Sequence, residues 1–190
     1  MLRAAALLAL VPLFASAQPL TVSVNGTVGG RWLDEHLVRS AHQRASLSGG
    51  DLAFGGSVEL SGRLSRLRLG GQLALDALES PRGLDVARNG PLQPLAQTGD
   101  TVTSALFFTA APFAGLAIGR DEAFHGWLDL LVAVELLSAK VEGERMLGVT
   151  ASPTLRLGFA VELGDVGVEL SLLGGFLGTT RVALALGLRL

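Results

Sequence analysis

Apolar residues recur at every second position along most of this chain, in runs of about ten residues that end in turn-forming residues. The last run is the clearest: Val182, Leu184, Leu186 and Leu188 alternate with other residues as far as Leu190. A period of two places successive side chains on opposite faces of a β-strand, whereas an amphipathic helix repeats about every 3.6 residues. The alternation therefore predicts an all-β chain whose strands have one apolar face and one more polar face.

Regular alternation predicts six strands, and two further regions are less regular. The six strands cover residues 20–28, 52–61, 66–76, 155–163, 166–172 and 181–190. We predict strands also at 128–137 and 140–150, although the leucine spacing of 128–137 equally fits one face of a helix.

Residues 101–119 contain no charged residue and are long enough to suggest a transmembrane helix. Pro112 and Gly115 interrupt this segment, and proline costs about 3 kcal/mol in a helix interior. We therefore predict two strands, 102–110 and 113–120, joined by a turn at 111–112. The total is then eight to ten antiparallel strands.

The N-terminal residues have a different character. Arg3 precedes an apolar stretch from Ala4 to Phe14, and Ala15-Ser16-Ala17 has the small-x-small form of a cleavage site. This is the pattern of a secretory signal peptide, and the apolar stretch is shorter than the roughly 20 residues of a membrane-spanning helix. We predict a signal peptide at 1–17 and one exported domain at 18–190.

Composition excludes several classes of protein. The chain has no cysteine, which excludes disulfides and thiolate metal sites. A formal net charge of −2 and a pI near 5.9 argue against nucleic-acid binding. Charged residues make up only 17% of the chain and the mean hydropathy is +0.47, whereas soluble domains usually carry about 25% charged residues.

The connections between the predicted strands alternate in length. Long polar stretches at 30–51 and 79–100 are predicted as loops, and short turns are predicted near 61–65, 111–112 and 164–165. Alternating long and short connections are typical of an up-and-down sheet whose long loops lie at one end.

Alternation does not say which face of the strands lies inside. A soluble barrel or sandwich would turn its apolar face inward, around a core or an apolar ligand, whereas a membrane barrel turns that face outward into lipid. The outer-face residues here would be almost purely leucine and valine. The other face carries few charges, of both signs. This balance favours the membrane barrel.

A membrane barrel of this size would enclose a charged interior. The predicted interior network comprises Glu59, Arg66, Arg68, Asp76, Arg156, Glu162, Glu169 and Arg181. We expect Arg66 and Arg68 to pair with Glu59, and Glu162 and Glu169 to meet Arg156 or Arg181. Buried charges are costly unless paired, so the network is interpreted as a plug of salt bridges. A gated, ion-conducting path is the alternative.

Five aromatic residues are predicted to lie at the two membrane interfaces, as in the aromatic girdles of membrane barrels. They are Trp32, Trp127, Phe107, Phe108 and Phe113. The alternative is that they are ordinary core aromatics.

Taken together, the signal peptide, the alternating strands of about ten residues, the short turns, the long loops and the amphipathic last strand resemble the small bacterial outer-membrane β-barrel proteins. The resemblance covers the whole exported chain and includes no diagnostic motif. It implies a location in the outer membrane, contact with outer-membrane lipid and insertion by the barrel-assembly machinery. Those proteins usually end in an aromatic residue, and this chain ends in Leu190.

No catalytic, metal-binding or cofactor-binding residue is predicted. His36 and His42 share a polar segment with acidic residues, but their spacing is not that of a metal-binding helix pair. His125 follows Asp121 and Glu122, and a catalytic histidine there, near the outer rim of the predicted barrel, is the enzymatic alternative. No serine elbow or phosphate-binding glycine loop is present.

The sequence therefore predicts a non-enzymatic outer-membrane β-barrel with a plugged interior. Its role would be structural, or interaction with an unidentified partner through loops 30–51 and 79–100. The alternatives are a small, poorly conducting channel and a soluble periplasmic barrel that binds an apolar ligand.

Overall fold

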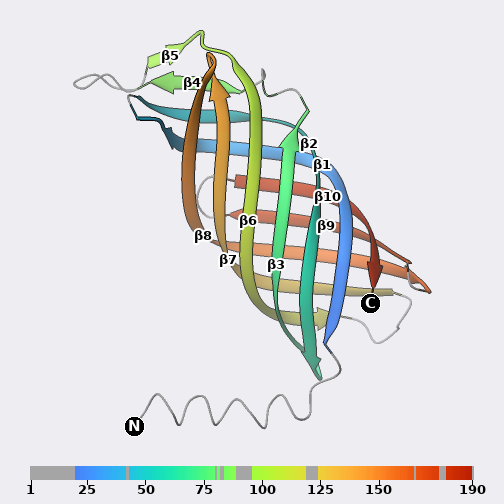
Figure 1. The fold of residues 1–190 in the computed structure, drawn as a ribbon. Coiled ribbons are helices and arrows are strands. Elements are labelled where there is room, and N and C mark those ends of the chain that lie inside the picture. The colour runs from blue at the N-terminus through green and yellow to red at the C-terminus, as the bar shows by residue number, and fades with distance from the viewer. Residues whose placement is uncertain are drawn as a thin grey trace, which may run out of the picture.

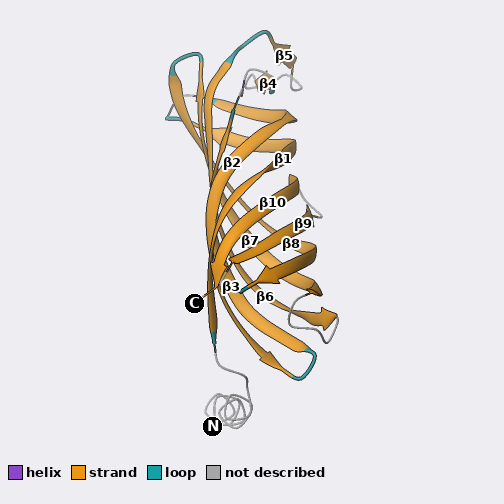
Figure 2. Ribbon diagram, turned by 90° about the vertical axis from the view of Figure 1, so that its right-hand side faces the viewer, coloured by secondary structure: helices purple, strands orange, loops and turns teal. Residues whose placement is uncertain are grey.

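The computed structural model describes residues 20–41, 43–79, 81, 84–88, 96–118, 124–164, 166–175 and 179–189. The predicted signal peptide at 1–17 lies outside these residues. Ten strands are present in the described ranges (Figure 2). They are β1 (Thr21–Arg39), β2 (Arg44–Leu64), β3 (Leu67–Leu78), β4 (Asp85–Arg88), β5 (Ala96–Thr98), β6 (Val102–Ile118), β7 (Phe124–Val141), β8 (Glu144–Leu163), β9 (Val166–Gly175) and β10 (Thr179–Arg189).

Eight of these strands close into an antiparallel barrel (Figure 1). Their order is β1-β10-β9-β8-β7-β6-β3-β2, and β2 pairs with β1 to complete the ring. The start of β1 lies beside the end of β10, where Ser23 is opposite Arg189. We call this end of the barrel the terminus end and the opposite end the far end. The predicted all-β antiparallel barrel is confirmed, at the lower limit of the eight to ten strands expected.

Five barrel strands are longer than a membrane crossing requires. β1, β2, β6, β7 and β8 have 17 to 21 residues, whereas a tilted membrane strand needs about 9 to 11. The shorter β3, β9 and β10 have 10 to 12 residues. The additional residues of the five long strands lie at the far end, where β4 pairs with the edge of β2 beyond the end of β3, and β5 pairs with β4. We call this part of the molecule, formed by β4, β5 and the far ends of the five long strands, the extension (Figure 2).

The extension replaces the loop predicted at 30–51, and that prediction was wrong. β1 continues to Arg39 and β2 begins at Arg44. In the turn between them, the backbone N–H of Ser40 donates a hydrogen bond to the carbonyl of Gln43 at 2.9 Å. A β-bulge lies between Leu33 and His36, with Glu35 at a φ of 47°. The segment is polar because the outward face of the extension lies beyond the apolar layer of the membrane, and polarity alone does not distinguish such a strand from a loop.

Two predicted boundaries were also wrong. Residues 102–118 form the single strand β6, without a turn at 111–112. Pro112 is accommodated because the ladder to β7 is interrupted there and resumes at Phe113. The predicted strand 140–150 is divided by the turn of the β7–β8 hairpin. Glu142 and Gly143 form this turn with φ values of 48° and 85°, and positive φ at both positions is typical of a two-residue hairpin turn.

Candidate functional site: the charged lumen and the extension

Side chains alternate between the outer surface of the barrel and its lumen. On β7, Leu128, Leu130 and Val132 are exposed outside, whereas Asp129 and Leu131 are completely buried. The same alternation leaves leucines and valines exposed all around the barrel, and it turns arginines and carboxylates inward. This arrangement suits lipid and is the reverse of a soluble barrel with an apolar interior. The predicted alternative of a soluble barrel around an apolar ligand is therefore wrong.

One charged cluster occupies the half of the lumen nearer the terminus end. It consists of Glu59, Arg68, Asp129 and Arg156, and we call it the lower cluster. Arg156 Nη1 lies 2.9 Å from Glu59 Oε2, and its Nη2 lies 2.6 Å from Asp129 Oδ2. Arg68 forms ion pairs with the same two carboxylates. The four residues therefore form a closed ring of ion pairs across β2, β3, β7 and β8.

Aromatic rings cover the guanidinium groups of the lower cluster. The Arg68 and Arg156 guanidinium carbons lie 4.6 and 4.7 Å from the centroid of the Phe113 ring. Arg68 also lies 5.0 Å from the Trp127 ring. Cation–π contact stabilises an arginine where water is excluded, so these rings help to hold the charges inside.

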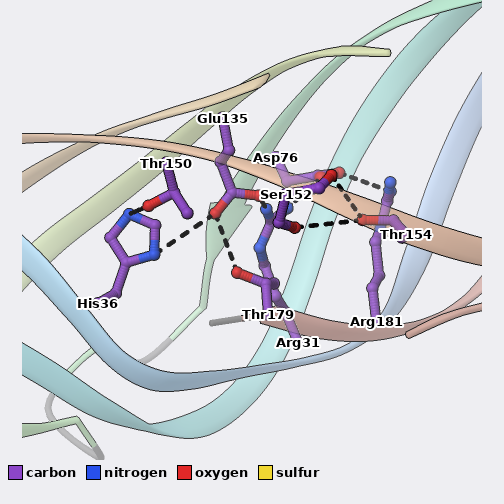
Figure 3. Close-up of polar contacts among 9 residues, drawn as sticks. All are labelled: Arg31, His36, Asp76, Glu135, Thr150, Ser152, Thr154, Thr179 and Arg181. Atoms are coloured by element: carbon purple, nitrogen blue, oxygen red, sulfur yellow. Dashed lines mark hydrogen bonds and ion pairs between the residues drawn. The ribbon is translucent and has the colours of Figure 1, made fainter. Parts of the chain in front are cut away.

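A second charged cluster, the upper cluster, lies farther along the lumen toward the far end (Figure 3). It consists of Arg31, Asp76, Glu135 and Arg181. Asp76 receives Arg31 Nη1 at 2.8 Å and Arg181 Nη2 at 2.7 Å, and Arg31 also pairs with Glu135. The guanidinium carbon of Arg31 lies 3.9 Å from the centroid of the Phe107 ring.

Polar side chains complete the surroundings of Glu135 (Figure 3). Thr179 Oγ1 donates to Glu135 Oε1 at 3.2 Å. His36 lies between Glu135 and Thr150, with its Nδ1 at 3.9 Å from Glu135 Oε1 and its Nε2 at 3.2 Å from Thr150 Oγ1. His36 is therefore enclosed in the barrel interior rather than in the solvated loop expected from the sequence.

In each cluster two arginines face two carboxylates, so their charges balance. Buried ion pairs are tolerated when every charge has a partner, and removing one partner leaves a costly buried charge. The clusters hold six barrel strands together through contacts far apart in the sequence, such as Arg156 with Glu59.

Glycines make room for the clustered carboxylates. Gly115 is opposite Asp129 in the sheet, and Gly55 is opposite Asp76. A Cβ at Gly115 would lie 2.1 Å from Asp129 Oδ1 and 2.4 Å from the carbonyl oxygen of Leu128. Because the second neighbour is backbone, the strand itself would have to move.

This crowding predicts a large effect for Gly115→Val. We expect the free energy of unfolding in lipid to fall by about 1–3 kcal/mol, since the added methyls overpack the lumen and displace Asp129. The control is Gly167→Val on β9, where an added Cβ has no neighbour within 4 Å. Denaturant titration of both variants in vesicles measures the difference. Equal costs at the two sites would show that the lumen around Asp129 is not tightly packed.

The extension has an apolar core that closes the lumen at the far end. Its buried side chains come from seven strands and include Val38, Leu47, Val86, Phe107 and Met146. β4 covers this core from the edge of β2, and β1 reaches β8 directly where Arg39 is opposite Leu147. An ion crossing the lumen would have to pass through this apolar packing.

A small cavity adjoins each of the two charged clusters. One of about 100 Å³ lies at the terminus end, below the lower cluster, with Ser23, Arg63 and Glu169 among its lining residues. The other, of about 50 Å³, lies beside the upper cluster, with Gln72 and Ser152 in its wall. Neither is lined by residues of the apolar extension core.

The structure brings together most of the predicted interior network. Glu59, Arg68, Asp76, Arg156 and Arg181 lie in the two clusters. Glu169 lines the cavity below the lower cluster. Glu162 lies at the same end, where its Oε1 is 3.5 Å from His125 Nε2.

Arg66 does not belong to the interior, and its prediction as an interior residue was wrong. It lies in the turn between β2 and β3 and its side chain is exposed. Alternation with Arg68 suggested an inward side chain, but alternation holds only within a strand, and β3 begins after Arg66 at Leu67.

Three network residues were missing from the sequence prediction. Arg31 was assigned to a loop, and Asp129 and Glu135 lie on β7, whose inward face also carries apolar Leu131 and Leu137. A signal was present in the sequence for two of them: Asp129 and Glu135 are six positions apart, an even spacing that places both on one strand face.

The predicted interface aromatics divide between the two faces. Trp32 and Phe108 are exposed on the outer surface, and Trp32 lies over Gly30 and Gly50. Trp127, Phe107 and Phe113 are buried in the interior, so their prediction as interface residues was wrong. They point inward because the arginines of the lumen require apolar and aromatic cover.

The histidines form no described metal site. His42, Asp121 and Glu122 lie outside the described residues, and within the described part of the chain no group of three potential ligands converges. His125 lies at the terminus end, at the start of β7, rather than at the far rim expected. Among the described residues, no helix is long and apolar enough to span a membrane.

Solved structures of small outer-membrane proteins share this fold. Neisserial surface protein A (NspA) superposes with a TM-score of 0.56 at 10% identity, covering 92% of this chain and 97% of NspA. Ail, the attachment invasion locus protein of Yersinia pestis, superposes with a TM-score of 0.52 at 11% identity, covering 91% of this chain and 99% of Ail. A second Ail structure, in complex with the heparin analogue sucrose octasulfate, has a TM-score of 0.50 at 12% identity and covers 90% and 98%.

Comparisons at the level of sequence find no counterpart. No protein-family model and no curated protein matches the chain. The closed antiparallel ring, the outward leucines and valines, and the superpositions on NspA and Ail agree on one conclusion. The chain has the fold of the small outer-membrane β-barrel proteins.

Proposed function

We propose that this protein is a non-conducting, non-enzymatic barrel of the bacterial outer membrane, with a structural or surface-contact role carried by its extension. The signal peptide at 1–17 would export the chain, and the barrel-assembly machinery would insert it. The observation that carries the proposal is the inversion of faces: leucine and valine cover the outside, while paired charges and an apolar core fill the inside.

The orientation of the barrel follows from its two ends. Small outer-membrane barrels have both termini and their short turns in the periplasm. The terminus end carries the turn at Ser65 and Arg66, and the far end carries the extension. The extension would therefore project from the cell surface. The surface role is in keeping with the names of the two neighbours, a surface protein and an attachment invasion locus protein.

The structure changes the description of the two segments that were predicted as interaction loops. The predicted loop 30–51 is the β1–β2 hairpin, and segment 79–100 contributes β4 and β5 to the same sheet. A rigid, apolar-cored extension presents a fixed surface and so avoids the ordering cost that a mobile loop incurs on binding.

Fractionation and gel migration test membrane insertion. We expect the protein in the outer-membrane fraction, extractable only by detergent, and migrating faster unboiled than boiled. The control is the same sample after boiling, which has the same mass but is unfolded. Recovery in the soluble periplasm would contradict the proposal.

Planar bilayer recording tests the closed lumen. We expect no stable single-channel steps from the inserted wild-type barrel, because the two ion-pair clusters and the extension core lie in series along the lumen. The small-channel alternative predicts discrete, reproducible conductance steps. Heat-modified migration of the same preparation shows that the recorded protein was folded.

A further inference from the structure

Four basic residues lie side by side on the outward face of the extension. They are Arg39 on β1, Arg44 on β2, Lys140 on β7 and Arg145 on β8, and we call them the basic row. All four side chains are exposed. Their strand neighbours Val38, Ala45, Ala139 and Met146 are buried in the extension core, so the four side chains must point away from it.

Strand register places these residues on one face. Arg39 is directly opposite Arg44, and Lys140 is directly opposite Arg145. Arg39 is also opposite Leu147, which lies two positions from Arg145 and therefore on the same face of β8. The sheet thus presents one continuous stretch of positive charge across β7, β8, β1 and β2.

This arrangement is unfavourable for the isolated barrel. Residues directly opposite on antiparallel strands have their Cβ atoms about 4.5–5.5 Å apart, and like charges at that spacing destabilise the pair. None of the four forms an ion pair with a carboxylate of the described chain. Glu142, in the adjoining turn, instead accepts hydrogen bonds from Thr101 at 2.7 and 3.0 Å. An anionic counterpart from outside the chain would relieve this repulsion.

The position of the row indicates where that counterpart lies. Leu37 and Leu147, the next outward residues toward the barrel, are exposed and apolar. Trp32, farther down β1, is exposed at a position suited to a membrane interface. Side chains on the outer surface of a barrel point sideways into the membrane layer rather than up into the medium. The row would therefore meet the headgroups of surrounding lipids.

We propose that the basic row binds the phosphate groups of anionic glycolipids in the outer leaflet. Several arginines and one lysine on a rigid sheet are suited to this task, because guanidinium groups bind phosphate oxygens in pairs. The exposed carboxylates Asp34 and Glu35 lie at the bulge beyond Leu37 and leave the row itself uniformly positive. The inference rests on the proposed orientation, with the extension at the cell surface.

Binding of diphosphoryl lipid A in zwitterionic detergent micelles tests the proposal. The variant replaces Arg39, Arg44, Lys140 and Arg145 with glutamine. A basic residue near an anionic surface contributes about fivefold in affinity. We therefore expect each single substitution to weaken binding about fivefold, and the quadruple variant to bind more than about 100-fold more weakly than the wild type. Wild-type binding should also weaken with lipid A that carries one phosphate, and with added salt.

Arg66→Gln is the matched control. Arg66 is an exposed arginine of the same barrel at the opposite end, so its loss should leave binding unchanged. Arg39→Lys/Arg44→Lys keeps the charge but loses the paired guanidinium contacts, so its affinity should lie between those of the wild type and the quadruple variant. All variants should keep heat-modified migration, because removing mutually repelling surface charges does not unfold a barrel.

Three outcomes would overturn the proposal. The quadruple variant could bind lipid A as tightly as the wild type does, or Arg66→Gln could weaken binding as much as the quadruple variant does. Alternatively, row-dependent binding could be found only for soluble sucrose octasulfate and not for lipid A, which would make the row a site for soluble polyanions. Loss of heat-modified migration by the wild type would instead refute the membrane barrel itself, so the two failures are distinguishable on the same samples.

Discussion

Asp129→Asn should lower the free energy of unfolding by about 3–5 kcal/mol, the usual cost of removing one member of a buried ion-pair network. Asp129 is completely buried, and its Oδ2 alone receives Arg68 and both Nε and Nη2 of Arg156, the last two at 3.1 and 2.6 Å. Asparagine keeps the shape and removes the charge. The two guanidinium groups are then left with Glu59 as their remaining partner in the cluster.

The measurement is equilibrium unfolding in urea of the barrel folded into phospholipid vesicles. Asp34→Asn is the control, because Asp34 is exposed on the extension and surface substitutions usually change stability by less than about 0.5 kcal/mol. The double variant Asp129→Asn/Arg68→Gln restores the charge balance. It should therefore be less destabilised than the sum of the two single changes. Additive costs, or equal costs for Asp129 and Asp34, would contradict the interpretation of the lower cluster as a structural plug.

The residues of the lower cluster show how far the sequence alone leads. Glu59 and Arg68 were predicted as partners because they lie on the two strands of one hairpin, whose opposite faces are mostly leucine and valine. The structure brings them together as predicted. Asp129 was missed because β7 has apolar residues on both faces: its inward side carries Leu131 beside the clusters and Leu137 in the extension core. Where both faces of a strand carry apolar residues, the sequence no longer alternates with a period of two, and a helix fits it equally well.

The extension was missed for the opposite reason. In lipid, the outward face of a strand must be apolar, and this requirement makes alternation visible in the sequence. Beyond the apolar layer of the membrane, the same strands can carry Asp34, Arg39 or Arg44 on their outward face. The segment then reads as a polar loop, although Val38 and Ala45 still fill the core inside. Only the pairing of β1 with β2, which is a property of tertiary structure, distinguishes the two.

The adjacent residues Phe107 and Phe108 on β6 give the second large prediction. Phe107 is 0% exposed, belongs to the extension core and lies against Arg31. Phe108 is 45% exposed on the outer surface. Phe107→Ala should lower the free energy of unfolding by about 3–5 kcal/mol, because it leaves a cavity that the lumen cannot fill and uncovers a guanidinium group. Phe108→Ala should cost about 1 kcal/mol or less, because lipid chains are as apolar as the lost ring and occupy the vacated space.

The pair tests the direction of the barrel faces with two substitutions of identical chemistry, one residue apart on the same strand. Both substitutions change the composition and the intrinsic strand propensity of β6 in the same way, so only the environments of the two rings differ. A soluble barrel with its apolar face inward would reverse the order, since Phe108 would then be the core residue and Phe107 would face water. Urea unfolding of both variants in vesicles decides between the two. A larger cost for Phe107 would show that the lumen, with its charges and its apolar cap, is the packed core of this protein.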